Sequence, residues 1–160
     1  MRDWCSAPRA PIDRKLHDAY NDEYVEYTKE GFIMAPIAFT LEAGNAALEA
    51  AYEGARADNW DGVGSKRVEL STYKYAQQFL QFVPNYIALP EIVADTDGEI
   101  LFEWDDGPQQ VFAVSIDKYG TLSYAGLFSR DKVHGREPFS APLPSAILSG
   151  FEQLSNHVGS

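Results

Sequence analysis

Four short segments between residues 91 and 128 alternate with glycine-containing turns, and this pattern most constrains the fold of the chain. The segments EIVAD, EILFEW, QVFAVSI and TLSYAGLF are rich in β-branched and aromatic residues, which favour strands. The intervening TDG, DDGP and DKYG are turn sequences with glycine where a positive φ is needed. Connections this short join antiparallel neighbours. The sequence therefore predicts an antiparallel β-meander of about four strands.

Helix-prone segments are available to cover one face of this sheet, on which Ile100, Phe102 and Trp104 alternate with outward-facing residues. One segment follows Thr40, a natural N-cap, and a second follows Ser71, the expected N-cap, and stops before a proline. A third lies near the end of the chain. The apolar positions at helical spacing are Leu41, Leu48, Tyr52 and Ala55, then Ala76, Phe79, Leu80 and Val83, then Ile147, Phe151, Leu154 and Val158.

The predicted fold class is α+β, a β-meander packed by two or three helices, with an N-terminal extension. Residues 1–40 are expected to form an arm, with a short helix around Asp13–Lys29 and an extended piece, FIMAPIAF. The apolar residues of that piece suit docking on the core or on a partner. Residues 41–160 are expected to form a single domain.

The overall charge is strongly acidic, with 24 Asp and Glu against 13 Lys and Arg and a formal net charge of −11. Binding to a phosphate backbone needs a basic patch, so no direct nucleic-acid binding is expected. Cys5 is the single cysteine, which excludes an intramolecular disulfide. No segment resembles a signal sequence or a membrane span, so we expect a cytoplasmic protein that does not contact a membrane.

The loop in RADNWDGVGSKRVELS, residues 56–71, suggests phosphate or metal binding at first sight, but the spacing supports neither. A P-loop requires G-x-x-x-x-G-K-[ST] after a strand, whereas Ser65 precedes Lys66 and the preceding segment reads as helix. A calcium loop requires alternating acidic positions, which Asp58 and Asp61 do not provide. DTDGE at 95–99 also fails this test and is better explained as a hairpin turn. The preferred interpretation is a structural turn, in which Asn59 or Asp61 binds nearby N–H groups.

Catalytic signatures are weak in this sequence. His17, His134 and His157 are far apart, and no G-x-S-x-G elbow occurs. The carboxylates Glu103, Asp105 and Asp106 could in principle act as acid and base, but two of the three lie beside or in a turn, where exposure is expected. We therefore predict no catalytic residues, no cofactor and no metal.

Acidic residues accumulate where cations are missing, because no Lys or Arg occurs between Tyr75 and Asp117. Hairpin turns and alternating strand positions could gather these carboxylates on one rim and one face of the sheet. The plain interpretation is a solvated face that discourages edge-to-edge aggregation. The functional interpretation is a surface that binds a basic partner. The candidate partner-binding residues are Glu99, Glu103, Asp105, Asp106 and Asp117.

Several motifs together resemble a family of uncharacterised bacterial proteins. They are NWDGVGS, a helix ending FLQFVP, and a strand that includes DGEILFEW, over about residues 57–128. The family pattern is a W-D-G-x-G-[AS] loop and a D-G-x-[IV]-x-x-E-W strand. The resemblance implies an α+β fold and a setting in mobile or defence-related genes, and it carries over no activity. The signature residues that it implies are Trp60, Asp61, Gly62, Gly64, Gly98, Glu103 and Trp104.

Two functional hypotheses follow. The first is a non-catalytic acidic protein-binding module, such as an inhibitor or antitoxin-like protein, acting on a basic, nucleic-acid-handling protein partner. The alternative is a small enzyme or small-ligand-binding protein that uses Asp61, Glu103 and Trp104 around one pocket. The sequence leaves the oligomeric state open.

Overall fold

The computed structural model describes residues 25–28, 31–34, 38–140 and 142–156 of the 160. The chain divides into two compact units, Met1–Ile37 and Ala38–Ser160. In the first unit, strands β1 (Val25–Thr28) and β2 (Gly31–Met34) pair antiparallel. The expected helix is therefore wrong over residues 25–28, where Val25, Tyr27 and Thr28 are residue types that favour extended backbone. The rest of the predicted helix, residues 13–24 and Lys29, lies outside the described part of the chain.

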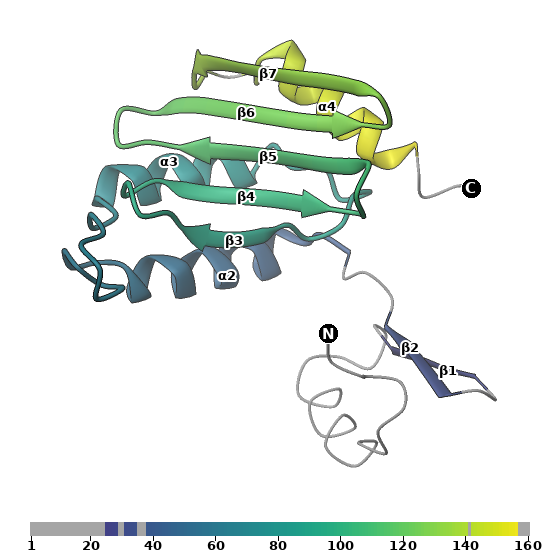
Figure 1. Cartoon of the computed structure of the whole chain (residues 1–160), viewed down its shortest axis with the longest axis horizontal. Helices are drawn as coiled ribbons and strands as arrows, with labels where there is room; N and C mark the ends of the chain where they lie inside the picture. The colour runs from purple at the N-terminus through teal and green to yellow at the C-terminus, as the bar shows by residue number, and fades with distance from the viewer. Residues whose placement is uncertain (1–24, 29–30, 35–37, 141, 157–160) are drawn as a thin grey trace. The chain divides into compact units, whose positions relative to one another are not determined.

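The second unit is built on an antiparallel sheet with the strand order β3-β4-β5-β6-β7 (Figure 1). Its strands are β3 (Glu91–Ala94), β4 (Ile100–Asp105), β5 (Gln110–Ile116), β6 (Thr121–Phe128) and β7 (Asp131–Pro138). Each strand pairs with the next along the chain, so the sheet is a meander. The predicted α+β class is confirmed, with five strands where about four were expected.

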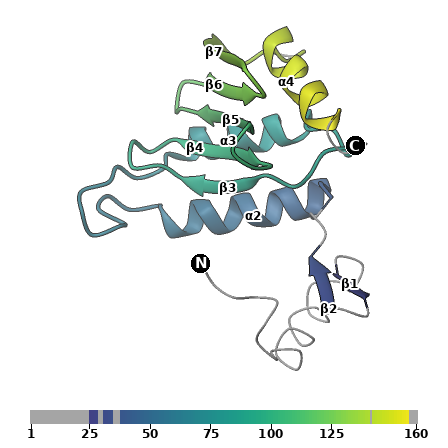
Figure 2. The ribbon, with the colours of Figure 1, turned by 45° about the vertical axis from the view of Figure 1, so that its right-hand side comes forward.

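Three helices in the described residues pack on this sheet, α2 (Leu41–Gly54), α3 (Leu70–Leu80) and α4 (Ser145–Ser155). Figures 1 and 2 show α3 and α4 on one face of the sheet, and α2 alongside β3. Thr40 caps α2 as predicted, because its hydroxyl accepts a hydrogen bond of 3.1 Å from the N–H of Ala43. The N-cap of α3 is Glu69, without a side-chain cap, so the predicted cap at Ser71 is two residues late.

The core lies between the helices and the inner face of the sheet. The predicted inward residues Ile100, Phe102 and Trp104 are all buried, and the Phe79 ring of α3 lies 4.8 Å from that of Phe102. Burial of one such aromatic side chain contributes about 1.5–3 kcal/mol. Phe151 of α4 completes this aromatic cluster. The helical stripes are therefore largely as predicted.

Leu41 is wrong as a core position, because its side chain is 43% exposed at the first residue of α2. A residue at the end of a helix extends past the layer that covers the sheet, so helical spacing alone does not ensure burial there. Val158 lies outside the described residues.

Candidate functional site: the open face of the sheet

The loop between α2 and α3 is held together by its own polar groups. The Oδ1 of Asp61 accepts hydrogen bonds from the N–H groups of Val63 (3.0 Å) and Ser65 (3.1 Å), and its Oδ2 accepts one from the Ser65 hydroxyl. The pKa of Asp61 is lowered, mainly by the hydrogen bond from the Ser65 hydroxyl. Partial burial would raise this pKa, whereas the hydrogen bonds from the backbone N–H groups lower it further. Gly62 and Gly64 adopt φ of 80° and 96°. The carboxylate therefore stabilises its own turn.

This loop also packs on the β3–β4 turn. The N–H of Lys66 donates to the carbonyl of Thr96 at 2.9 Å, and the indole N–H of Trp60 donates to the carbonyl of Lys66 at 3.0 Å. Gly98 has φ of 87°, and a Cβ on it would lie 2.5 Å from the carbonyl oxygen of Arg67. The loop motif and the D-G motif are thus two halves of one structural contact, although they are more than thirty residues apart in the chain.

The residues of the ligand-pocket hypothesis are not brought together. Trp104 is buried on the inner face, where its indole N–H donates to the carbonyl of Ala88 at 2.8 Å. Glu103 is the neighbouring strand residue and lies on the opposite face. Asp61 is engaged in its loop, and its pKa is lowered rather than raised. No common pocket therefore joins these three side chains.

The five predicted partner-binding carboxylates do not form one rim. Turns in a meander alternate between the two ends of the strands, so Asp105 and Asp106 lie at the opposite end of the sheet from Glu99 and Asp117. Glu103 lies between them on the outer face. The prediction of a single rim is wrong for this geometric reason.

Asp117 is largely engaged within the chain. Its Oδ1 accepts hydrogen bonds of 2.8 Å from the N–H groups of both Tyr119 and Thr121, and its Oδ2 lies 3.3 Å from Arg136. Burial alone would raise the pKa of Asp117, but these hydrogen bonds outweigh it and lower the pKa. Asp117 therefore stabilises the β5–β6 turn and is a poor candidate for contact with a partner.

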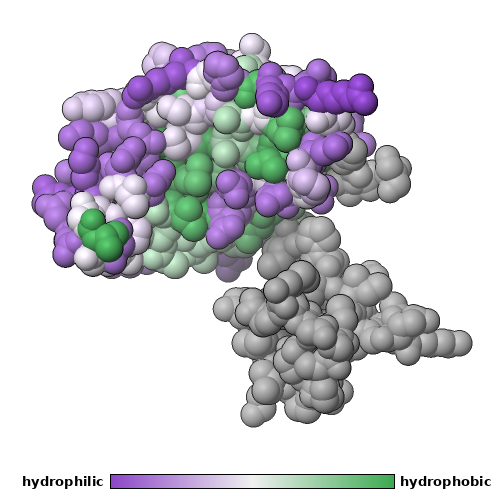
Figure 3. All heavy atoms as spheres, viewed as in Figure 1, coloured by the Kyte–Doolittle hydropathy of each residue, from purple (hydrophilic) through white to green (hydrophobic). Residues whose placement is uncertain are grey.

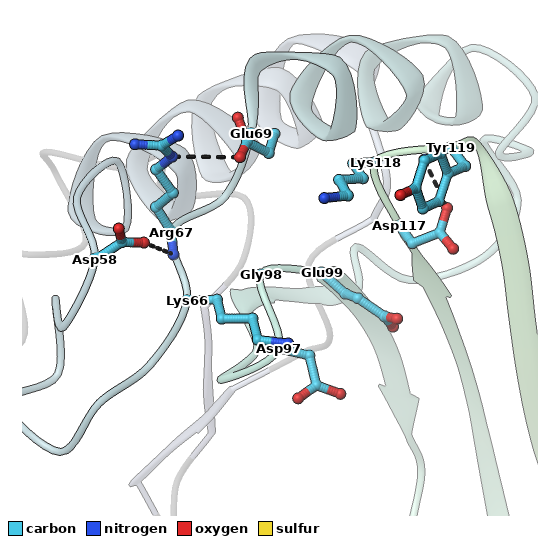
Figure 4. Close-up of a pocket in the computed structure, with 10 residues that line it drawn as sticks. All are labelled: Asp58, Lys66, Arg67, Glu69, Asp97, Gly98, Glu99, Asp117, Lys118 and Tyr119. Atoms are coloured by element: carbon cyan, nitrogen blue, oxygen red, sulfur yellow. Dashed lines mark hydrogen bonds and ion pairs between the residues drawn. The ribbon is translucent and has the colours of Figure 1, made fainter.

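A charged hollow of about 520 Å³ lies at the end of the sheet that carries Glu99 and Asp117 (Figure 4). It mixes three cations with five carboxylates, and some of them are already paired, as Arg67 is with Glu69 at 3.3 Å. No histidine or cysteine lines it. Among the described residues, no group of three His, Cys, Asp or Glu side chains could hold a metal ion. The hollow thus has no histidine or cysteine that could act as a nucleophile, and its mixed charges would not concentrate a ligand of either sign.

The outer face of the sheet is left uncovered by the helices of this unit (Figures 1 and 2). The register aligns Asp105, Val111, Leu127 and Lys132 in one row across the strands, and Glu91, Glu103, Ala113, Ala125 and His134 in the next. A third row holds Val93, Leu101, Ser115, Ser123 and Arg136. Figure 3 shows this face with hydrophobic groups across its middle and hydrophilic groups around them. We refer to it as the open face.

Charge is divided across the open face from one edge to the other. Glu91, Glu103 and Asp105 lie on β3 and β4, whereas the basic residues lie on β7: Lys132, His134, and Arg136, which is already paired with Asp117. The strands between them, β5 and β6, present only uncharged residues in these three rows. The acidic half agrees with the charge distribution noted in the sequence. The basic half was missed, although basic residues at every second position of DKVHGREP are the signal of a strand with one basic face.

Searches against known protein families, curated proteins and solved structures find no match to the chain. The family resemblance of the loop and strand motifs therefore stays a prediction. None of the helices in the described part of the chain is both long and apolar enough to cross a membrane.

Proposed function

We propose that the chain is a non-catalytic protein-binding module that acts on a protein partner with a basic, nucleic-acid-handling surface. An inhibitor or antitoxin-like role in the cytoplasm, in the mobile-element or defence setting that the motif resemblance implies, fits this chemistry. The observation that carries the proposal is the acidic half of the open face. There Glu91 is exposed, and Glu103, which is paired with Glu91 on one side and Ala113 on the other, is half-buried.

This half combines two properties that protein partners recognise. Its carboxylates supply an attractive field for a basic surface, which accelerates encounter and selects the partner. Val93 and Leu101, paired across β3 and β4, supply apolar area beside those carboxylates. Asp105 and Asp106 extend the acidic surface at the adjoining turn. An inhibitor that occupies the phosphate-binding site of a nucleic-acid-handling protein needs such a surface, because that site is basic.

The alternative enzymatic function is not favoured by the geometry. Its three residues lie in a loop, on the outer face and in the core. Among the described residues, Asp61 and Asp117 are the carboxyl groups whose pKa is lowered, and in both the lowering comes from hydrogen bonds that stabilise a turn. A general acid or base needs a pKa near the working pH, so a catalytic carboxyl group would need a raised pKa and not a lowered one.

The proposal is tested by affinity capture with the tagged full chain and lysate of the native host, followed by mass spectrometry. We expect a basic protein to be retained at about 0.15 M salt and released at about 1 M, because salt screens exposed charge pairs. The double variant Glu91→Lys/Glu103→Lys should lose it. The matched control Glu49→Lys/Glu152→Lys changes the net charge equally at exposed helix positions and should keep it. Equal capture by both variants would contradict the proposal.

A further inference from the structure

The charge division makes the open face complementary to itself. Carboxylates occupy one edge, cations occupy the other, and an uncharged band separates them. A surface of this kind attracts a second copy only if the copy is turned so that opposite edges meet.

Two face-to-face twofold arrangements keep the strands of the two sheets aligned, and one of them satisfies the charges. If the axis runs parallel to the strands along β5, then β7 of one copy lies over β3 of the other, and β6 lies over β4. If the axis runs across the strands, β3 lies over β3 and β7 over β7, which places like charges together. In the first arrangement Glu91 lies over His134, with Lys132 and Arg136 two residues away along β7 on either side, and Ala113 lies near the axis. Such an interface is isologous, since both copies use the same patch.

The middle of the face suits close packing of two sheets. Ala113, Ala125, Ser115 and Ser123 are small, so two sheets can approach without large side chains holding them apart. Strands about 4.8 Å apart and about seven residues long make a face of roughly 20 Å by 20–25 Å. Two copies would bury on the order of 1,000 Å², which is near the lower end for specific interfaces. The expected product is a reversible, concentration-dependent dimer.

The unpaired edge of β7 is the competing route to a dimer, and its charges oppose it. In an antiparallel β7–β7 pair, outward side chains of one copy lie opposite outward side chains of the other. Those side chains include Lys132 and Arg136, so their positive charges would face each other across the pair. Like charges directly opposite each other destabilise a strand pair.

We propose that the partner for the open face, in the absence of any other protein, is a second copy of this chain, bound face to face about a twofold axis parallel to β5. This inference does not depend on the proposed function, and it is tested with the purified protein alone. Where both hold, the second copy and the basic partner compete for Glu91 and Glu103.

Sedimentation velocity of the full chain over a range of concentrations is the first experiment. We expect the wild type to shift from monomer to dimer as concentration rises. Ala113→Glu should weaken association at least tenfold, because it places two carboxylates beside the axis. Ala50→Glu makes the same change at an exposed position of α2 and should dimerise like the wild type. Circular dichroism of each variant establishes that the fold is retained.

A mixing experiment tests the orientation of the two copies. Glu91→Lys and Lys132→Glu should each weaken self-association, since each sets like charges at both ends of the interface. A mixture of the two variants should recover the dimer. In the mixed dimer the introduced lysine of one chain meets the introduced glutamate of the other, and the unchanged Glu91 and Lys132 meet at the opposite end. A wild type that stays monomeric at every concentration would overturn the inference. So would variants that dimerise unchanged, or a mixture that stays monomeric.

Discussion

Gly98 shows how one residue joins two distant parts of the chain. It combines a positive φ of 87° with a backbone neighbour, the carbonyl of Arg67, that cannot move like a flexible side chain. Gly107, in the next turn, has φ of 102° and no atom close to the position of a Cβ. A side chain at either position would strain the backbone, but only a side chain at Gly98 would also clash with a neighbouring atom.

Substitution of these glycines gives a matched pair of predictions. Gly107→Ala should lower the free energy of unfolding by about 1–2 kcal/mol, the strain of a left-handed alanine. Gly98→Ala should lower it by about 2–5 kcal/mol, because the strain is joined by overpacking against the loop. Urea denaturation measures both values. Equal losses would show that the loop moves aside at little cost.

Asp61 predicts a dependence of stability on pH. Its pKa is lowered in the folded state, so its contribution is fully present above the unfolded value of about 3.9. That contribution is lost as the pH falls through the folded value. Asp61→Asn should therefore lower the melting temperature at pH 7 and have a smaller effect near pH 2. Asp106→Asn, at an exposed turn position, is the control and should show little difference at either pH.

Among the elements, the strands of the meander were predictable where burial and turn chemistry agreed. The segments that became β3 to β6 have apolar residues on the inner face and glycine in their turns, and both signals are local. β7 carries no apolar run, and its strand form depends on pairing with β6 along its whole length. Because β7 was not predicted as a strand, the basic half of the open face, which lies on β7, was not predicted either. Local signals thus predicted one half of the candidate site and not the other.

The contact between α4 and the sheet depends on a glycine that helix propensity disfavours. A Cβ on Gly150 would lie 2.4 Å from Cζ of the Phe112 ring, which is fully buried. Gly150→Ala gains up to about 1 kcal/mol of helix propensity, but overpacking against the ring costs about 1–3 kcal/mol. We expect a net loss of stability in thermal unfolding. Ser149→Ala, exposed in the same helix, should be neutral or slightly stabilising. A gain at both positions would mean that α4 packs less closely than described.

At the scale of the whole molecule, net charge and local charge pattern act in opposite directions on self-association. The net charge of −11 makes two copies repel each other at long range. The open face attracts at short range, because β3 of one copy meets β7 of the other. The range of each effect is set by the Debye length, which is about 30 Å at 0.01 M salt and about 8 Å at 0.15 M.

This opposition predicts that dimerisation passes through a maximum as salt is varied. At about 0.01 M the repulsion between the two acidic chains is scarcely screened, so association should be weak. At about 0.15 M the long-range repulsion is screened while close pairs across the interface persist, so association should be strongest. Near 1 M the pairs themselves are weakened, and the dimer should decline again. Sedimentation velocity over this range measures the change. Association that only rises with salt would show that apolar contact, without the charge pattern, holds the copies together.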